Sequence, residues 1–332
     1  MDLSLRKALL CLASSAALLT ANVGQAAEEL KLAHFVSTTH VLNKSIIDPL
    51  KEQVESRTNG DLTIKVYPGG ELGSGPMEQY VRALQGVADI TWGLSGYTSS
   101  QFKKSMVVEL PGVIPDGTSG YDMLWNAYDS ELKGEFPGTK PLALWVSEPN
   151  VLIMKDKEIH SPEDLKGLKI RVSGAMTGKL IEAYGATPVQ MSAGEIYNSL
   201  QTGLIDGVAT GASAINDFKL DEVANSYTVG APLGHIMFYL VMNQKKYDSL
   251  SDEQKAAIDA SSGRELSKSG EMAWNKLAGE TMDRLRADTG STVVDLTPEQ
   301  VQAFSAIAEP FVEKSLEEID GGKAVLDAML KH

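Results

Sequence analysis

Short apolar runs alternate with longer amphipathic stretches along most of this chain. In the first half, the apolar runs cover residues 30–36, 62–67, 87–92 and 142–146. Runs of this length that are rich in Val, Ile and Leu are typical of buried strands, whereas the stretches between them repeat apolar residues at helical spacing. Alternating strands and helices predict an α/β protein whose sheets are mostly parallel and flanked by helices.

A second set of apolar runs indicates a second sheet. Its runs cover residues 151–154, 168–172, 187–191, 205–210 and 227–229. The next run, at residues 236–242, is predicted to return to the first sheet. Two sheets that exchange strands predict a two-lobed binding protein with a cleft between the lobes, and a length of 332 residues fits two domains. The expected boundaries are residues 27–148 with 236–275 for lobe I, and residues 149–235 with 276–332 for lobe II.

A helical pattern over residues 251–287 is long enough to run along both lobes. It opens with a capping box from Ser251 to Gln254, and roughly 37 residues at about 1.5 Å per residue reach about 55 Å. Three glycines, Gly263, Gly270 and Gly279, argue against one unbroken helix. Each destabilises a helix by up to about 1 kcal/mol relative to alanine. In an earlier helix, expected near residues 41–58, Pro49 should cause a kink or mark the true start.

Residues 1–26 have the pattern of a secretory signal peptide. Arg6 and Lys7 precede an apolar run, and small residues up to Ala26 form a cleavage site. The apolar run is shorter than the ~20 residues needed to cross a bilayer, which argues against an uncleaved anchor. The only cysteine, Cys11, lies in this segment, so the mature protein would form no disulfide. The sequence therefore predicts export to the periplasm.

The chain is acidic, with a formal net charge of −14 at pH 7. This charge argues against nucleic acid as a partner, because nucleic acid requires a basic surface. An anionic solute would also gain nothing from the overall field of the protein. Attraction must therefore be local, and a positioned arginine could supply it.

Arg171 stands out because of its place in the segment LKIRV. The apolar residues Leu168, Ile170 and Val172 face one side of the expected strand, which leaves Arg171 on the other side near its carboxyl end. In open α/β sheets, small molecules bind outside the carboxyl ends of the strands. A planar guanidinium at that position suits a carboxylate.

Several motifs, in this order and spacing, resemble one known family. SPEDLKGLKIRV at residues 161–172 is followed by GATPV at 185–189 and by Asp206-Gly207, and TNGDLTIKVYPGGELG precedes them at 58–73. Together they resemble the solute-binding (DctP-type) subunits of tripartite ATP-independent periplasmic (TRAP) transporters. The resemblance implies a periplasmic-binding-protein fold in which a long helix crosses both lobes. It also implies a receptor that delivers an organic acid to TRAP membrane subunits, with Arg171 holding the acid's carboxylate bidentately.

The chain departs from the family pattern at two positions. Many members carry a second arginine where Pro149 and Asn150 stand here, and an Asn-Pro pair is missing after Gly207. Asn150 and Thr210 are expected to supply neutral hydrogen bonds instead. A site with one guanidinium should favour a monocarboxylate, because a second, unpaired charge would cost several kcal/mol on burial. Ala193, where relatives often carry a bulkier residue, leaves room for a ring or a branched chain.

Several residues at expected strand ends are candidates for the lining of a ligand site. Apolar walls with a few polar groups are usual for small-molecule sites, although core packing is the commoner fate of such side chains. These candidates are Trp92, Tyr97, Trp145, Met154 and Phe238. Phe35 and His40 follow the first strand, and Glu71 matches a family position near the cleft rim. A cap-adjacent role for His40 and a turn for the glycines beside Glu71 are the alternatives.

Enzyme motifs are absent from the sequence. We find no Gly-x-Ser-x-Gly elbow, no phosphate loop and no His-Glu-x-x-His motif. His34 and His40 are badly spaced for a shared metal ion, so neither a metal nor a cofactor is expected. A periplasmic enzyme acting on a small acid would have to use Ser173, His40 or Glu71. A receptor that reports to a sensor kinase or chemoreceptor is a further alternative, and a monomer is expected.

Overall fold

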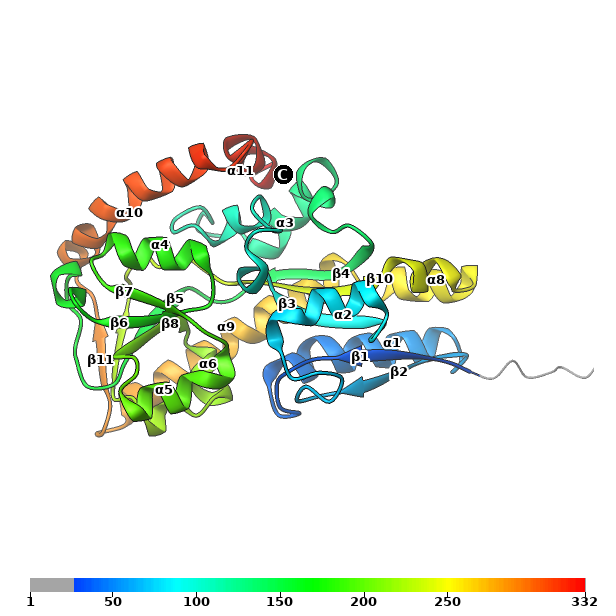
Figure 1. Cartoon of the computed structure of the whole chain (residues 1–332), viewed down its shortest axis with the longest axis horizontal. Coiled ribbons are helices and arrows are strands. Elements are labelled where there is room, and N and C mark those ends of the chain that lie inside the picture. The colour runs from blue at the N-terminus through cyan, green and yellow to red at the C-terminus, as the bar shows by residue number, and fades with distance from the viewer. Residues whose placement is uncertain (1–26, 332) are drawn as a thin grey trace, which may run out of the picture.

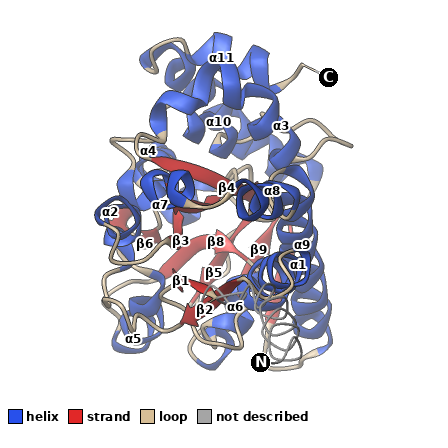
Figure 2. Cartoon of the chain, turned by 90° about the vertical axis from the view of Figure 1, so that its right-hand side faces the viewer, coloured by secondary structure: helices blue, strands red, loops and turns tan. Residues whose placement is uncertain are grey.

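The computed structural model describes residues 27–331 of the chain. The predicted signal peptide, residues 1–26, lies outside the described residues. Two sheets lie side by side, and helices surround both of them (Figures 1 and 2). This arrangement confirms the predicted two-sheet α/β fold.

The first sheet has five strands in the order β2-β1-β3-β10-β4. β1 runs parallel to β2 and β3, whereas β10 runs antiparallel to both of its neighbours. The predicted return of residues 236–242 to this sheet is therefore confirmed. The strands are β1 (Glu28–Ala33), β2 (Leu62–Tyr67), β3 (Ile90–Leu94), β4 (Thr139–Val146) and β10 (Met237–Asn243).

The second sheet has six strands in the order β11-β9-β5-β8-β6-β7. β5 is antiparallel to both β8 and β9, whereas the other pairs are parallel. The carboxyl end of β5 therefore lies at the opposite edge of the sheet from the carboxyl ends of β6 and β8. The strands are β5 (Asn150–Met154), β6 (Lys169–Val172), β7 (Thr187–Gln190), β8 (Gly207–Gly211), β9 (Ser226–Val229) and β11 (Thr292–Asp295).

Helices cover both faces of each sheet with apolar side chains. The first sheet packs between one layer that includes α1 (Asp48–Arg57), α8 (Asp252–Ala260) and α9 (Arg264–Ala287), and another that includes α2 (Gln79–Gln85) and α3 (Gly120–Ala127). The second sheet packs between α5 (Ile196–Thr202), α6 (Ser213–Asp217) and α9 on one face, and α4 (Ala175–Ala183) and α10 (Pro298–Glu318) on the other. The short α7 (Gln244–Ser249) follows β10. Within residues 27–331, no helix is both long enough and apolar enough to cross a membrane.

The predicted helix over residues 251–287 is in fact two helices. α8 ends before Gly263, whose φ of +83° is favourable only for glycine, and α9 starts directly after it. The Gly263 N–H donates to the Leu142 carbonyl, which ties this break to the first sheet. Trp274 of α9 packs on the first sheet and Leu285 on the second, so the predicted long helix that crosses both lobes is α9 without α8.

Two further elements refine the sequence expectations. Pro49 lies in the first turn of α1, directly after a π-helical turn at Asn43–Ile47, so it marks the start of the α-helix. At the other end of the chain, α10 packs on the second sheet, whereas α11 (Gly322–Met329) packs on α3 of the first lobe. The lobe boundaries drawn from the sequence remain a prediction.

Candidate ligand-binding site

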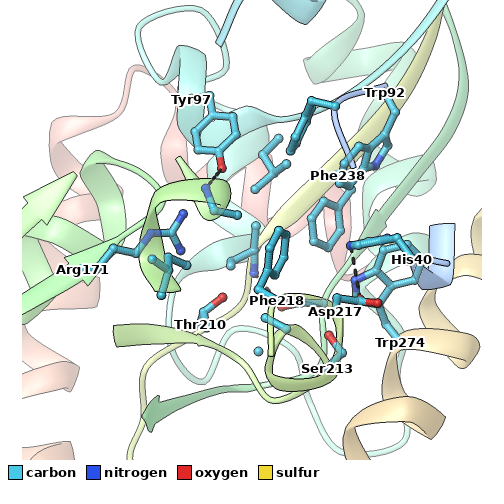
Figure 3. A pocket seen from close by; sticks show the side chains of 18 residues that line it. His40, Trp92, Tyr97, Arg171, Thr210, Ser213, Asp217, Phe218, Phe238 and Trp274 are labelled. Carbon is cyan, nitrogen blue, oxygen red and sulfur yellow. Dashed lines mark hydrogen bonds and ion pairs between the residues drawn. The ribbon is translucent and has the colours of Figure 1, made fainter. Parts of the chain in front are cut away.

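A cavity of about 500 Å³, including the part open to solvent, lies between the two sheets. Most of its walls are apolar or aromatic, with polar groups at a few points (Figure 3). The first lobe contributes Phe35, His40, Trp92, Leu94, Tyr97, Ser147, Ile236 and Phe238. The second lobe contributes Arg171, Ala193, Ile196, Thr210, Gly211, Ser213, Ala214, Asp217 and Phe218, and α9 adds Trp274.

Arg171 reaches this cavity from the carboxyl end of β6, and its side chain is almost wholly buried, with 1% exposed. Its Nε and Nη2 donate to the Met191 carbonyl at 3.1 and 2.9 Å, which fixes the plane of the guanidinium. Among residues 27–331, no carboxylate forms an ion pair with it. Burial lowers its pKa, but a guanidinium remains charged in proteins. Tyr97 and Glu195 oppose this shift, although Glu195 lies beyond ion-pair distance. The cavity therefore contains an oriented cation that has no carboxylate of the described residues within ion-pair distance.

Two hydroxyl groups lie beside Arg171. The Tyr97 hydroxyl accepts from the Ala193 N–H at 3.0 Å, so its own hydrogen remains available to donate. Thr210, in β8, forms no side-chain hydrogen bond with the described part of the chain. Figure 3 shows both side chains near the guanidinium. Together with Arg171, they make this end of the cavity rich in hydrogen-bond donors.

Aromatic rings form much of the wall contributed by the first lobe. Phe35 stacks on Trp92 with ring centroids 4.8 Å apart, and Trp92 stacks on Phe238 at 5.7 Å. Trp274 lies 5.4 Å from Phe238. Flat aromatic surfaces of this kind suit a planar ring, because offset and edge-to-face contacts add to the area that is buried.

His40 and Asp217 close the end of the cavity opposite Arg171 (Figure 3). His40 Nδ1 accepts from the Leu42 N–H at 3.1 Å, so Nε2 carries the proton of the neutral ring, and Nε2 lies 3.3 Å from Asp217 Oδ2. Burial, with a smaller effect of His34, lowers the pKa of His40 to about 3. Burial raises the pKa of Asp217 to about 7. An uncharged imidazole from one lobe thus lies against a carboxyl group from the other.

The lobes also meet at two glycines beside the cavity. A Cβ atom on Gly174, which precedes α4, would lie 2.6 Å from the Cα of Gly96, which follows β3. Backbone from the two lobes therefore touches at this point, and no side chain fits between them. The described conformation is closed here.

The structure places six of the ten candidate residues on the cavity wall. Arg171, Thr210, Trp92, Phe35, His40 and Phe238 line it, as do Tyr97 and Ala193. Their ligand contacts remain predictions, because the location of a side chain does not establish binding. Ser173 is buried outside the lining, and within residues 27–331 no group of three metal-ligating side chains occurs.

Four candidates lie outside the lining, for separate reasons. Trp145 is fully buried behind Phe238 and Trp274, with centroids 5.5 and 5.6 Å away. Asn150 donates to the Leu233 carbonyl at 3.2 Å. Met154 ends β5, which is antiparallel, so it pairs with Gly207 at the edge of the sheet away from the cavity. Glu71 is exposed in the turn after β2.

Sequence reasoning missed five polar or aromatic residues that line the cavity. Ser213, Asp217 and Phe218 follow β8 directly, so the rule that ligands meet the carboxyl ends of strands could have found them. Ser147 follows β4 in the same way. Trp274 gives no such signal, because it lies in the middle of α9 and reaches the cavity only through tertiary packing.

Comparison with known proteins finds relatives over most of the chain. Residues 32–319 match the family described as bacterial extracellular solute-binding protein, family 7. The ectoine-binding periplasmic protein TeaA of Halomonas elongata is 29% identical over 283 residues, covering 81% of this chain and 80% of that protein.

Two solved structures share the arrangement of both lobes. A TRAP solute-binding protein from Rhodoferax ferrireducens, in complex with copurified benzoate, has a TM-score of 0.85 at 26% identity, covering 91% of this chain and 96% of that chain. A TRAP solute-binding protein from an unidentified marine microbe, specific for aromatic acid ligands and in complex with 3-hydroxybenzoate, has a TM-score of 0.83 at 27% identity, covering 91% and 96%.

Proposed function

The chain belongs to family 7 of the bacterial extracellular solute-binding proteins, and from this premise we propose that it binds an aromatic monocarboxylate and delivers it to TRAP membrane subunits. It is a TRAP-type periplasmic solute receptor, and members of the family are binding proteins, not enzymes. Export by cleavage after Ala26 and a monomeric state are parts of the same proposal. The identity of the ligand is argued below from the cavity.

The observation that carries the proposal is the buried guanidinium of Arg171, which has no carboxylate within ion-pair distance in the described part of the chain. An unpaired buried charge costs free energy, and a ligand carboxylate would supply the missing anion with bidentate geometry. The cavity lining contains no second arginine or lysine. A dicarboxylate would therefore leave one of its charges uncompensated, so a monocarboxylate fits better.

The aromatic character of the ligand is supported by the opposite wall. The stacked rings of Phe35, Trp92 and Phe238 offer flat apolar surfaces that suit a single substituted ring. Two structural neighbours are described in complex with benzoate and 3-hydroxybenzoate. Because these neighbours share 26% and 27% identity with the chain, they support the ligand class but do not establish it.

The test is Arg171→Ala, assayed by titration calorimetry with benzoate. The variant should lose about 2–5 kcal/mol of binding free energy, because the carboxylate would enter a desolvated site without its partner. Its thermal stability should be unchanged or higher, since a buried uncompensated cation is removed. Lys169→Ala is the matched control, because Lys169 is the exposed cationic residue of the same strand. Equal affinity of Arg171→Ala and wild type would exclude Arg171 from the site.

A further inference from the structure

The two ends of the cavity differ in the direction of the hydrogen bonds that they offer. Near Arg171 the free groups are donors, namely the guanidinium N–H groups and the hydroxyls of Tyr97 and Thr210. At the far end the group is the Asp217 carboxyl, which faces the cavity beside His40 (Figure 3). A ligand that satisfies both ends must accept hydrogen bonds at one end and donate at the other.

Asp217 has acceptor capacity that the protein does not use. A carboxylate has about four lone-pair positions, and the groups that face Asp217 are His40 Nε2, 3.3 Å from Oδ2, and the Val41 N–H. The lining also contains two serines, Ser147 and Ser213. Ser147 Oγ donates to the Glu148 carbonyl and accepts from the Ile236 N–H, and the Ser213 backbone N–H donates to Glu148 Oε1 at 2.7 Å. In the described part of the chain, neither serine hydroxyl donates to Asp217.

We propose that Asp217 determines specificity by accepting a hydrogen bond from a hydroxyl group on the ligand, at the end of the molecule remote from its carboxylate. The preferred ligand is then a hydroxylated aromatic acid. This inference rests on the proposed function, because it assumes that Arg171 binds the carboxylate. Above about pH 7, where Asp217 is ionised, the same arrangement fixes the orientation of the ligand, since a carboxylate placed against Asp217 would meet a group of like charge.

The surroundings of Asp217 favour a neutral hydroxyl over an ammonium group. His40 lies in contact with Asp217, yet burial keeps its imidazole uncharged by lowering the pKa to about 3. Burial therefore imposes a desolvation cost on a cation at this place. An ammonium group on a ligand would meet the same cost, whereas a hydroxyl group carries no charge to desolvate.

The test compares matched ligands that differ only in the donor. Dissociation constants are measured by calorimetry at pH 8 for benzoate and for the hydroxy, methyl and aminomethyl derivatives at ring positions 3 and 4. A methyl group has nearly the shape of a hydroxyl but cannot donate. At one of the two positions, the hydroxy acid should bind about 10- to 100-fold more tightly than the methyl acid, as expected for a hydrogen bond to a charged group.

Asp217 variants then locate the effect. In Asp217→Ala the ratio of the two dissociation constants should fall to about one, whereas Asp217→Asn, which keeps an acceptor oxygen, should retain part of it. Because Asp217 also contacts His40 of the other lobe, both variants are expected to bind all ligands more weakly. The ratio is therefore the readout, since weaker closure affects the matched ligands equally.

Three results are distinguishable. If benzoate binds but the methyl acids match or exceed the hydroxy acids at both positions, the inference is overturned while the proposed function stands. If the aminomethyl acids bind more tightly than the hydroxy acids, the inference is also overturned, and Asp217 would instead bind a cationic group. If no aromatic acid in the series binds, the proposed function fails. The wild-type ratios decide these outcomes even if an Asp217 variant does not fold.

Discussion

At the scale of single residues, burial raises the pKa values of several carboxyl groups. It raises the pKa values of Glu109, Glu148, Asp217 and Glu271 to about 7, although backbone N–H groups oppose the shift in each case. Glu148 accepts from the Ser213 N–H, and Glu271 accepts from two N–H groups at the start of α3. These carboxyl groups satisfy backbone donors where elements meet, so their protonation is linked to the stability of the fold.

Glu109 allows this link to be tested away from the cavity. Its Oε1 accepts from the Ser95 hydroxyl and the Met237 N–H, both at 2.9 Å. Because its folded pKa is raised, the stability it contributes is full below its unfolded pKa of 4.5 and is lost as the pH rises through about 7. Between pH 5.5 and 8.5, wild type should therefore lose about 1–2 kcal/mol more than Glu109→Gln, which mimics the protonated group.

Urea unfolding at these two pH values measures the difference. Titration of the other carboxyl groups and of the histidines is common to both proteins, so it cancels in the comparison. Equal pH dependence of the wild type and of Glu109→Gln would contradict a raised pKa, because the folded and unfolded states would then bind the same number of protons at Glu109 in this range. The variant should remain folded, because its amide oxygen can still accept both hydrogen bonds.

The sequence predicted some residues of the site much better than others. Arg171 could be placed because one strand pattern fixes both its face and its distance from the strand end. Asn150 and Trp145 could not, because their side chains turn to a neighbouring carbonyl and to a buried ring cluster. His40 and Asp217 are 177 positions apart in the sequence, and the periodicity of apolar residues does not predict a contact over that separation.

At the scale of elements, strand direction explains the largest error. The strand at residues 151–154 was predicted correctly, but its position gave no information on whether it runs parallel to its neighbours. Because β5 is antiparallel, Met154 lies at the wrong edge of the sheet for a ligand contact. Gly263 indicated the break between α8 and α9, whereas Gly270 and Gly279 lie within α9 without interrupting it. At Gly270 a Cβ would lie 2.7 Å from Ile46 Cδ1, so close packing explains the glycine.

Closure of the two lobes depends on the contact between Gly96 and Gly174. In Gly174→Ala, the new Cβ would lie 2.6 Å from the Gly96 Cα, and only separation of the lobes or a backbone shift can relieve this clash. Overpacking of this kind typically costs about 1–3 kcal/mol. Since only the closed form encloses a ligand, affinity for benzoate should fall by about 5- to 150-fold.

Gly178→Ala is the matched control for this substitution. Gly178 lies in α4, which Gly174 directly precedes, and its nearest neighbours would be 3.6 and 3.7 Å from an added Cβ, which is ordinary contact. This control should bind like wild type and gain about 0.5–1 kcal/mol of stability from the better helix former. Calorimetry measures both affinities. Wild-type affinity in Gly174→Ala would mean that binding does not require this contact.

At the scale of the whole molecule, the net charge opposes the proposed ligand. The chain carries −14 at pH 7, and loss of the predicted signal peptide would make it one unit more negative. The cation that attracts a carboxylate is buried in the cavity, where its field is local. Long-range repulsion and short-range attraction therefore act at different stages, the first on approach and the second after entry.

Salt should separate these two stages. The Debye length falls from about 30 Å at 0.01 M to about 8 Å at 0.15 M, so salt screens the repulsion felt by an approaching anion. The association rate constant for benzoate should rise roughly two- to fivefold over this range, while the dissociation rate constant stays nearly constant because the bound pair is shielded from solvent. Stopped-flow fluorescence can follow both rates, since Trp92 and Trp274 line the cavity. An association rate that falls with salt would instead mean that Arg171 steers the anion from outside.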